Sequence, residues 1–319
     1  MNNKLPKELI DRLNEIYNKE EMEIIQAGFE CDDRKTSFRV NTLKSNDREI
    51  IEVLKNIGLE TKKVEFLKHG YILDNAVEKD LWELDIYKQG KIYVQSISSQ
   101  IPVDLLDIRD FDKILDITAA PGGKTSQASA FLKNTGEIVA VDNNQIRIDK
   151  LNFTLKRQGC RNVAVIKSDA KLIGNKNEDF RGYFDHIIAD LPCSAEGKIN
   201  INREKSYGFW SKGNINKNYY IQKDILNSVL PLLKNNGTLI YSTCTLAPEE
   251  NEAVVHMLLS NYPELQIQEI NLDYKYSKKG LAGFGKHVYR KDVSKTIRIL
   301  PSVESEGFFV AKFKKIKKD

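Results

Sequence analysis

Short apolar segments alternate with longer amphipathic segments from about residue 91 to residue 259, and no other feature of the chain restricts its fold as strongly. The apolar segments have the length of strands and are flanked by turn residues, while the segments between them show helical spacing. This alternation is typical of a parallel sheet whose crossover helices cover both faces. The sequence therefore predicts a doubly wound α/β domain. Its predicted strands are residues 113–117, 137–142, 162–169, 185–190 and 237–243.

The first 90 residues have a different pattern and are predicted to form a smaller α/β domain, which leaves residues 91–319 as the main domain. Helical spacing begins near Pro6, and a second short helix is predicted over residues 21–26, with Gly28 expected to end it. A helix-like segment at residues 92–106 introduces the main domain.

Further elements are predicted on both sides of these segments. In the small domain, residues 37–43 read as a strand, and apolar spacing predicts a helix from about residue 47 to residue 57, which Gly58 ends. Near the other end of the chain, residues 296–301 and 307–313 are predicted to form a pair of strands that closes one edge of the main sheet.

The composition is that of a globular protein, because 41% of the 319 residues are hydrophobic. The 49 basic residues exceed the 45 acidic ones by only four, which permits a nucleic-acid partner without requiring one. No apolar run approaches the roughly 20 residues of a membrane span. The four cysteines form no CxxC cluster and no secretory leader precedes them, so we expect a cytoplasmic protein with free thiols. We also expect a monomer, and no metal site, since the four histidines lie far apart.

Four acidic residues stand in or directly after the predicted strands: Asp116, Asp142, Asp169 and Asp190. A single acid in this position is ordinarily a turn residue or a helix cap. In an open parallel sheet, however, ligands bind outside the carboxyl ends of the strands. Four acids in equivalent positions therefore predict one shared crevice.

The segment TAAPGGKT at residues 118–125 follows the first of these strands. Its small residues allow a ligand to approach the backbone, and the helix that follows presents its positive end. The segment is not a phosphate-binding GxxxxGK[ST] loop, because Thr118 stands where glycine is required, and it contains no GxGxxG pattern. Asp142 ends the next strand, where a carboxylate accepts the ribose hydroxyls of a nucleoside. These features indicate an adenosine without a pyrophosphate.

Two cysteines stand just beyond predicted strands, Cys193 in DLPCSAEG and Cys244 in YSTCTLAPEEN. Free cysteines often serve as small buried hydrophobic residues, and we assign that role to Cys31 and Cys160, which have no motif around them. Two thiols delivered to one sheet edge beside an adenosine site instead favour chemistry. A nucleoside cofactor without a phosphate requirement points to S-adenosylmethionine.

Together these motifs resemble the Sun/Nol (RsmB/NOP-type) family of S-adenosylmethionine-dependent RNA cytosine-5 methyltransferases, and the resemblance covers nearly the whole chain. The chain departs from the commonest family pattern at Thr118, where many members carry cysteine, and at SAEG (194–197), which replaces SGxG. The matching segments are RVNTLK (39–44), VQSISSQIP (94–102), AAPGGKT (119–125), DLPCSAEG (190–197), YSTCTLAPEEN (241–251) and GFFVAKF (307–313).

The resemblance implies a seven-stranded, mostly parallel Rossmann-like methyltransferase sheet and a small N-terminal RNA-binding domain. It also implies that Cys244 adds to C6 of cytosine, which makes C5 nucleophilic, and that Cys193 helps to release the methylated base. Asp190 would hold the base near N3, and Lys124 would support the same end of the pocket. The positive charge of the cofactor should lower the pKa of Cys244. The expected cofactor-binding residues are Thr118, Ala119, Ala120, Pro121, Gly122, Gly123, Lys124, Asp142, Arg147, Asp169 and Asp190.

RNA is the expected partner, and its target base must leave the stack to reach the crevice. The segment 203–223 is rich in aromatic and basic residues, which predicts an RNA-contact surface, although Trp210 and Tyr219 would equally suit packing of a helix on the sheet. Ribosomal RNA is the first choice of substrate and transfer RNA the second. Two other functions stay open: a DNA cytosine-5 methyltransferase, in which Cys193 would be the nucleophile, and a non-catalytic RNA-binding protein.

Overall fold

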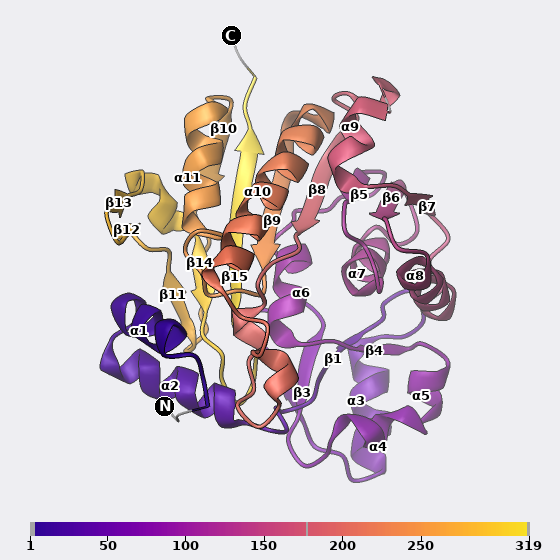
Figure 1. Cartoon of the computed structure of the whole chain (residues 1–319). Coiled ribbons are helices and arrows are strands. Elements are labelled where there is room, and N and C mark those ends of the chain that lie inside the picture. Colours follow the sequence, from indigo (N-terminus) through magenta and orange to yellow (C-terminus); the bar gives the residue numbers. More distant parts are fainter. Residues whose placement is uncertain (1–3, 177, 318–319) are drawn as a thin grey trace.

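The computed structural model describes residues 4–176 and 178–317, so the outermost ends of the two predicted domains lie outside the described residues. Figure 1 shows a large twisted sheet with helices on both faces and a small sheet packed near the carboxyl ends of the large sheet's parallel strands. No helix within the described residues combines the length and apolarity needed to cross a bilayer.

Five parallel strands form one half of the large sheet, in the order β7-β6-β5-β8-β9. Each matches a strand predicted from sequence, and the reversal of strand order beside β5 creates the point at which a crevice opens. Apolar runs that alternate with helices produce this arrangement because both faces of a parallel strand are buried. The bounds are β5 (Lys113–Asp116), β6 (Glu137–Asp142), β7 (Val163–Lys167), β8 (Phe184–Asp190) and β9 (Leu233–Thr243).

Antiparallel strands complete the sheet beyond β9 and confirm the predicted pair at the end of the chain. β15 pairs with β9 along one edge, and with β14 and β10 along the other. Two short strands, β10 and β11, extend the predicted seven-stranded arrangement to nine strands within the described residues. The bounds are β10 (Leu265–Gln268), β11 (Ser277–Lys279), β14 (Ile297–Ile299) and β15 (Phe308–Lys315), and a separate hairpin joins β12 (Gly283–Phe284) to β13 (His287–Val288).

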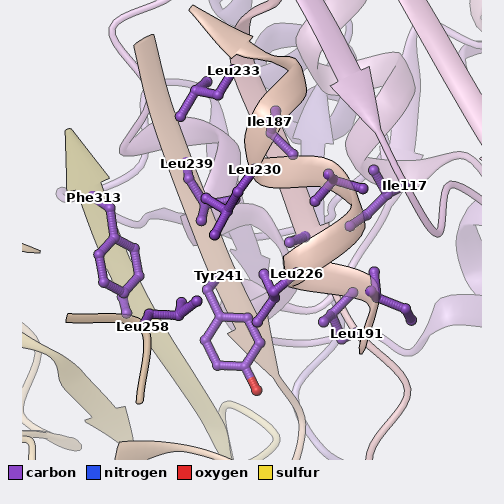
Figure 2. Packing of buried hydrophobic residues seen from close by; sticks show 14 of the residues in the cluster. Ile117, Ile187, Leu191, Leu226, Leu230, Leu233, Leu239, Tyr241, Leu258 and Phe313 are labelled. Carbon is purple, nitrogen blue, oxygen red and sulfur yellow. The ribbon is translucent and has the colours of Figure 1, made fainter. Parts of the chain in front are cut away.

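Alternate residues of the strands face two separate cores. On β9, Leu239 and Tyr241 pack with α10 and α11, as Figure 2 shows, whereas Ile240 faces α6 and α7. This period-2 alternation places helices on both faces of the sheet, as the doubly wound prediction requires. The covering helices are α6 (Ile97–Asp104), α7 (Gly123–Phe131), α8 (Gln145–Gln158), α9 (Ile173–Lys176), α10 (Lys212–Val229) and α11 (Glu252–Asn261).

The small sheet is antiparallel, with strand order β2-β3-β1-β4. The predicted helix-like segment 92–106 is wrong in its first part, because residues 92–94 form β4 and pair with β1, and the helix starts only at Ile97. Gly58 has a φ of +79° after α3, which agrees with its predicted role. The bounds are β1 (Ser37–Val40), α3 (Asp47–Asn56), β2 (Thr61–Lys63), β3 (Gly70–Leu73), α4 (Glu78–Trp82), α5 (Asp85–Lys88) and β4 (Ile92–Val94).

Two N-terminal helices, α1 (Lys7–Ile16) and α2 (Lys19–Glu30), lie apart from the small sheet. Asn18 and Glu21 form a reciprocal capping box that starts α2. The expectation that Gly28 ends this helix is wrong, because the helix continues to Glu30. Gly28 has another role: a Cβ atom there would lie 2.4 Å from the backbone of Pro301. The glycine allows α2 to approach another segment closely.

Candidate active site

A cavity of about 430 Å³ opens at the carboxyl ends of β5, β8 and β9. Its wall contains both the glycine loop that follows β5 and the two motif cysteines. Most of the predicted site residues thus meet in one place, although three of them, Gly122, Asp142 and Asp169, lie outside the wall. The predicted residues in the wall are Thr118, Ala119, Ala120, Pro121, Gly123, Lys124, Arg147, Asp190, Cys193 and Cys244.

The glycine loop turns sharply between β5 and α7. Gly122 has a φ of +104°, which L-residues avoid, and a Cβ atom there would lie only 3.0 Å from Leu151 of α8. The Ala119 amide donates to the carbonyl of Val141 on β6, at 2.9 Å. The small residues therefore allow the loop to pack closely against its neighbours. The Thr118 hydroxyl donates to the carbonyl of Asp190 at 2.7 Å, which ties the start of the loop to the end of β8.

The buried carboxylate of Asp142 ends β6, and its Oδ1 accepts from the Asn144 amide. Arg147 Nη2 lies 3.2 Å from Asp142 Oδ2 and donates to the Ala120 carbonyl at 2.9 Å. Throughout the described part of the chain, no group makes a well-aligned hydrogen bond to Asp142 Oδ2. A buried acceptor without a hydrogen bond beside the glycine loop fits a ligand that brings hydroxyl groups. Asp169 is exposed and caps a short turn by accepting from the Lys171 amide.

Asp190 ends β8 and is held on both carboxylate oxygens. Its Oδ2 accepts from Lys124 Nζ at 2.6 Å, and its Oδ1 accepts from the Ser242 hydroxyl at 2.8 Å. Lys124 also donates to the Ser99 hydroxyl at 2.9 Å, and its side chain is 10% exposed. A second carboxyl group in the wall, Asp116, is buried, which raises its pKa to about 6. The cavity floor therefore combines a fixed ammonium–carboxylate pair with a carboxyl group that can carry a proton.

The two motif cysteines meet at the cavity wall, with Sγ atoms 3.2 Å apart and both side chains partly exposed. They come from the loops that follow β8 and β9, so the parallel pairing of these strands brings them together. The remaining cysteines, Cys31 and Cys160, lie outside the wall. The prediction that two separate strands deliver two thiols to one edge thus describes the observed geometry.

The two thiols differ in their surroundings. A hydrogen bond from Cys193 lowers the pKa of Cys244, and the nearby Lys198 ammonium lowers it further. The same hydrogen bond, followed by burial and the negative charge of Cys244, raises the pKa of Cys193, and Glu250 acts in the same direction. Cys244 therefore loses its proton more readily than Cys193.

Several hydrogen bonds fasten the two cysteine loops to each other. The Gly197 amide donates to the Cys244 carbonyl at 2.9 Å, and the hydroxyls of Ser194 and Thr245 lie 2.6 Å apart. Glu250 accepts from the Ser194 amide at 3.0 Å. These contacts span both motifs, so the distance between the two thiols is fixed by the loops and not by the cysteines alone.

The small sheet contributes to the wall through Tyr93, Gln95 and Ser99 at β4 and the start of α6. Arg39 on β1 joins the two parts, because it donates to Gln95 at 2.9 Å and to the Ser126 hydroxyl of α7 at 2.7 Å. Sequence reasoning did not single out these residues or Lys198. The quoted motifs RVNTLK and VQSISSQIP contain Arg39, Gln95 and Ser99, whereas Tyr93 directly precedes the second motif and Lys198 directly follows the cysteine motif.

A second cavity of about 450 Å³ shares Val94, Ser96 and Lys198 with the first, and Arg203 lies in its wall. Of the predicted RNA-contact segment, Tyr207 is buried and Trp210 donates to Glu196 at 2.7 Å, so both pack within the protein. Phe209 and Tyr220 are exposed. Within the residues that can be described, His, Cys, Asp and Glu side chains form no cluster that could hold a metal ion.

Comparison with known proteins agrees with this geometry. A family model described as 16S rRNA methyltransferase RsmB/F matches residues 103–314. The tRNA (cytosine(49)-C(5))-methyltransferase of Pyrococcus abyssi is 32% identical over 98% of this chain and 97% of its own length. The ribosomal RNA small subunit methyltransferase F of Pectobacterium carotovorum is 30% identical over 98% of this chain, which spans only 63% of that relative.

Solved structures agree in fold. A methyltransferase homolog protein from Pyrococcus horikoshii superposes with a TM-score of 0.84 at 30% identity, covering 98% of this chain and 95% of its own. NSun6 from the same organism superposes with a TM-score of 0.79 at 24% identity, covering 98% and 99%, and supports the fold alone. The match to the family model and the relatives together confirm the resemblance seen in the motifs. The chain belongs to the RsmB/F family of S-adenosylmethionine-dependent RNA cytosine-5 methyltransferases.

Proposed function

We propose that this protein methylates C5 of a cytosine in ribosomal RNA through a transient bond between Cys244 Sγ and C6 of the base. The observation that carries the proposal is the pair of thiols, 3.2 Å apart, in the wall of a cavity that the glycine loop also lines. One wall therefore offers a nucleophile for the base next to a backbone that suits a nucleoside cofactor.

Cytosine C5 is a weak nucleophile, so the base must first be activated. The Cys244 thiolate forms the S–C6 bond, and the C5=C6 electron pair shifts toward N3, which takes up a proton. C5 of the resulting enamine then bonds to the methyl group as the methyl–sulfur bond of the donor breaks, and the electron pair of that bond stays on the sulfur. Loss of the C5 proton to water returns its electron pair to the C5=C6 bond and expels the Cys244 thiolate. N3 gives back the proton that it took up, which restores the enzyme and releases neutral 5-methylcytosine.

The Lys124–Asp190 pair is the proposed proton-holding group opposite N3. The Lys124 ammonium lies 2.6 Å from the Asp190 carboxylate, and it is proposed to donate a proton toward N3 as negative charge develops there. The hydroxyls of Ser99 and Ser242 fix its two members from opposite ends. The pair can therefore respond to charge on the base without moving its heavy atoms.

Cys193 is proposed to assist the release of the methylated base. Its raised pKa keeps it protonated, so its S–H can donate to the sulfur of Cys244 when that sulfur leaves C6 as a thiolate. A departing anion in a partly dry site depends strongly on such a donor.

S-adenosylmethionine, when bound, supplies a methyl group on a positively charged sulfur. Residues 118–124 are proposed to hold it, with Asp142 accepting its ribose hydroxyls through the oxygen that makes no hydrogen bond within the described residues. Arg147, which now contacts Asp142 and Ala120, would lie beside it. Asp169 is exposed outside the cavity wall, so we give it no direct contact.

RNA next to the target nucleotide is proposed to follow the second cavity, since the two cavities share part of their walls. The basic side chains of Arg34 and Arg203 lie in that wall and suit phosphate groups. The exposed ring of Phe209 offers a stacking surface for an unpaired base.

Separate alanine variants test the assignment of the thiols. We expect Cys244→Ala to reduce methyl transfer to RNA at least 1,000-fold, on the order of what loss of a nucleophile costs, and Cys193→Ala to accumulate a covalent protein–RNA complex. The complex is measured by denaturing gel electrophoresis with labelled RNA. The reverse result, with the complex trapped by Cys244→Ala, would indicate that Cys193 is the nucleophile, as in the DNA methyltransferase alternative.

Transfer RNA is the second candidate substrate, because the relative from Pyrococcus abyssi named for tRNA cytosine 49 matches over 97% of its length. The family model described as a 16S rRNA methyltransferase favours ribosomal RNA. Bisulfite sequencing of total RNA from cells with and without the gene separates the two. A protected cytosine that disappears from tRNA and not from rRNA would overturn the ribosomal assignment and leave the chemistry unchanged.

A further inference from the structure

Lys198 occupies a position that the sequence motifs do not mark. It lies five residues after Cys193, in the short turn Glu196–Lys198, and its side chain lines the cavity that contains both thiols. The same side chain lines the second cavity and is 50% exposed. Lys198 therefore stands where the two cavities meet, beside the proposed nucleophile.

The turn that carries Lys198 is held firmly. The Gly197 amide donates to the Cys244 carbonyl at 2.9 Å, and the Gly197 carbonyl accepts from the Gly307 amide at 2.9 Å. A Cβ atom on Gly197 would lie 2.1 Å from the Gly307 carbonyl oxygen, so the turn is pressed between two backbone segments. Because the turn is bonded directly to the backbone of Cys244, the base of the Lys198 side chain keeps a fixed position relative to that thiol.

Groups of both charges act on Cys244. A hydrogen bond from Cys193 lowers the pKa of Cys244 most, burial raises it, the Lys198 ammonium lowers it, and the carboxylates of Asp190 and Glu306 raise it. Asp190 is already paired with Lys124. Glu306 Oε2 lies 3.7 Å from Lys198 Nζ, and this contact orients the Lys198 ammonium. The ammonium in turn offsets part of the rise that Glu306 causes in the pKa of Cys244. The interaction is mutual, because the negative charge of Cys244 is the largest influence that raises the pKa of Lys198.

We propose that Lys198 is a positioning residue whose ammonium, placed in the same cavity wall by a turn bonded to the Cys244 backbone, stabilises the Cys244 thiolate before RNA and cofactor bind. This role rests on the proposed function of Cys244 as the nucleophile. An enzyme whose thiolate depended only on the cofactor's positive charge would activate the cysteine after cofactor binding. With Lys198 in place, the nucleophile is prepared in the free protein, and the cofactor's charge adds to an existing effect.

The test measures the thiol directly and needs neither RNA nor cofactor. Fully reduced protein is treated with iodoacetamide between pH 5 and pH 10, and the alkylation rate of Cys244 is followed by mass spectrometry. Trypsin separates the two thiols, because Cys244 falls in residues 235–275 and Cys193 in a peptide that begins at Gly182. We compare Lys198→Met and Lys198→Arg with the unchanged protein, and use Lys205→Met as the matched control, since Lys205 is exposed and lies outside both cavity walls.

We expect Lys198→Met to slow alkylation of Cys244 about tenfold at pH 7 and to shift its pH midpoint upward by about one unit, the lower end of the range for a nearby opposite charge. Lys198→Arg should restore most of the rate, and Lys205→Met should leave it unchanged. In methyl-transfer assays, the acid limb of the pH profile of Lys198→Met should move by the same amount.

Other outcomes would overturn the proposal. An unchanged alkylation profile together with a raised KM for RNA would make Lys198 an RNA contact instead. A rate loss that Lys198→Arg does not restore, with a lower melting temperature, would indicate a structural role. Because the alkylation assay contains no RNA, a failure here is distinct from a failure of Cys244→Ala to abolish methyl transfer.

Discussion

Glu250 is the single side chain that ties the cysteine motifs together most directly. It is fully buried, accepts from the Ser194 amide beside Cys193, and accepts from Gln222 of α10 at 3.0 Å. Burial raises its pKa from 4.5 to about 8, with the nearby carboxyl group of Glu196 adding to the rise. A protonated carboxyl group is therefore expected in the folded protein at neutral pH.

This raised pKa predicts a pH dependence of stability. Between about pH 5 and pH 8 the folded protein holds a proton on Glu250 that the unfolded chain has lost, so the free energy of unfolding falls as pH rises, by at most about 1.4 kcal/mol per pH unit from this group. In Glu250→Gln this part of the slope should disappear. Urea unfolding at pH 7.0, 7.5 and 8.0 measures it, at least about one unit above the pKa of Asp116. An identical slope in both proteins would contradict the prediction.

At the scale of single elements, α2 shows how tertiary contact changes the role of a residue. Helix propensity alone indicates that Gly28→Ala should stabilise the helix, since glycine is unfavourable inside helices. The structure reverses this expectation, because the new Cβ atom would lie 2.4 Å from Pro301 C and O and 2.6 Å from Ser302 N. These are backbone atoms, which cannot move aside as a flexible side chain would.

We therefore expect Gly28→Ala to destabilise the protein by about 1 to 3 kcal/mol, the usual cost of overpacking. The matched control is Gly213→Ala near the start of α10, where the added Cβ atom meets only Ser211 Oγ at 3.8 Å. That change should stabilise by up to about 1 kcal/mol. Both values come from urea unfolding curves, and stabilisation by Gly28→Ala would show that α2 does not pack against residues 301–302 as described.

At the scale of the whole molecule, Arg298 of β14 joins segments that are far apart in the chain. Its buried guanidinium donates to Glu252 of α11 at 2.5 and 2.6 Å, to the hydroxyl of Tyr17 at 2.9 Å, and to the carbonyl of Leu246 at 2.9 Å. Tyr17 follows α1, and Leu246 lies two residues after Cys244. One side chain thus connects the N-terminal helices, the antiparallel edge of the sheet and the loop of the proposed nucleophile.

Removing this connection should be costly. Arg298→Met leaves the buried carboxylate of Glu252 without its partner, so we expect a loss of about 3 to 5 kcal/mol in the free energy of unfolding. The control is Arg290→Met, since Arg290 pairs with Asp292 near the surface and its side chain is 47% exposed. Its loss should cost less than about 1 kcal/mol. Equal losses from the two variants in urea unfolding would contradict the role assigned to Arg298.

The sequence alone determined where the strands of the main domain lie along the chain and which side chains its site contains. Short, nearly continuous apolar segments specify these strands because each strand must bury both faces, and the five parallel strands were predicted within a few residues. The residues that end them, Asp116, Asp142 and Asp190, and the motifs around Cys193 and Cys244 were visible because chemistry requires particular side chains next to strand ends.

Only the tertiary structure decided which of these groups face one another and what surrounds them. The 3.2 Å contact of the two thiols depends on the pairing of β8 with β9, and the contacts of Lys198, Glu250 and Arg298 join residues separated by tens to hundreds of positions. Local sequence patterns carry no signal for such contacts, because burial and close approach of distant backbone segments arise only when the chain is packed. For the same reason propensity misplaced the end of α2, where Gly28 serves a neighbouring segment and not the helix itself.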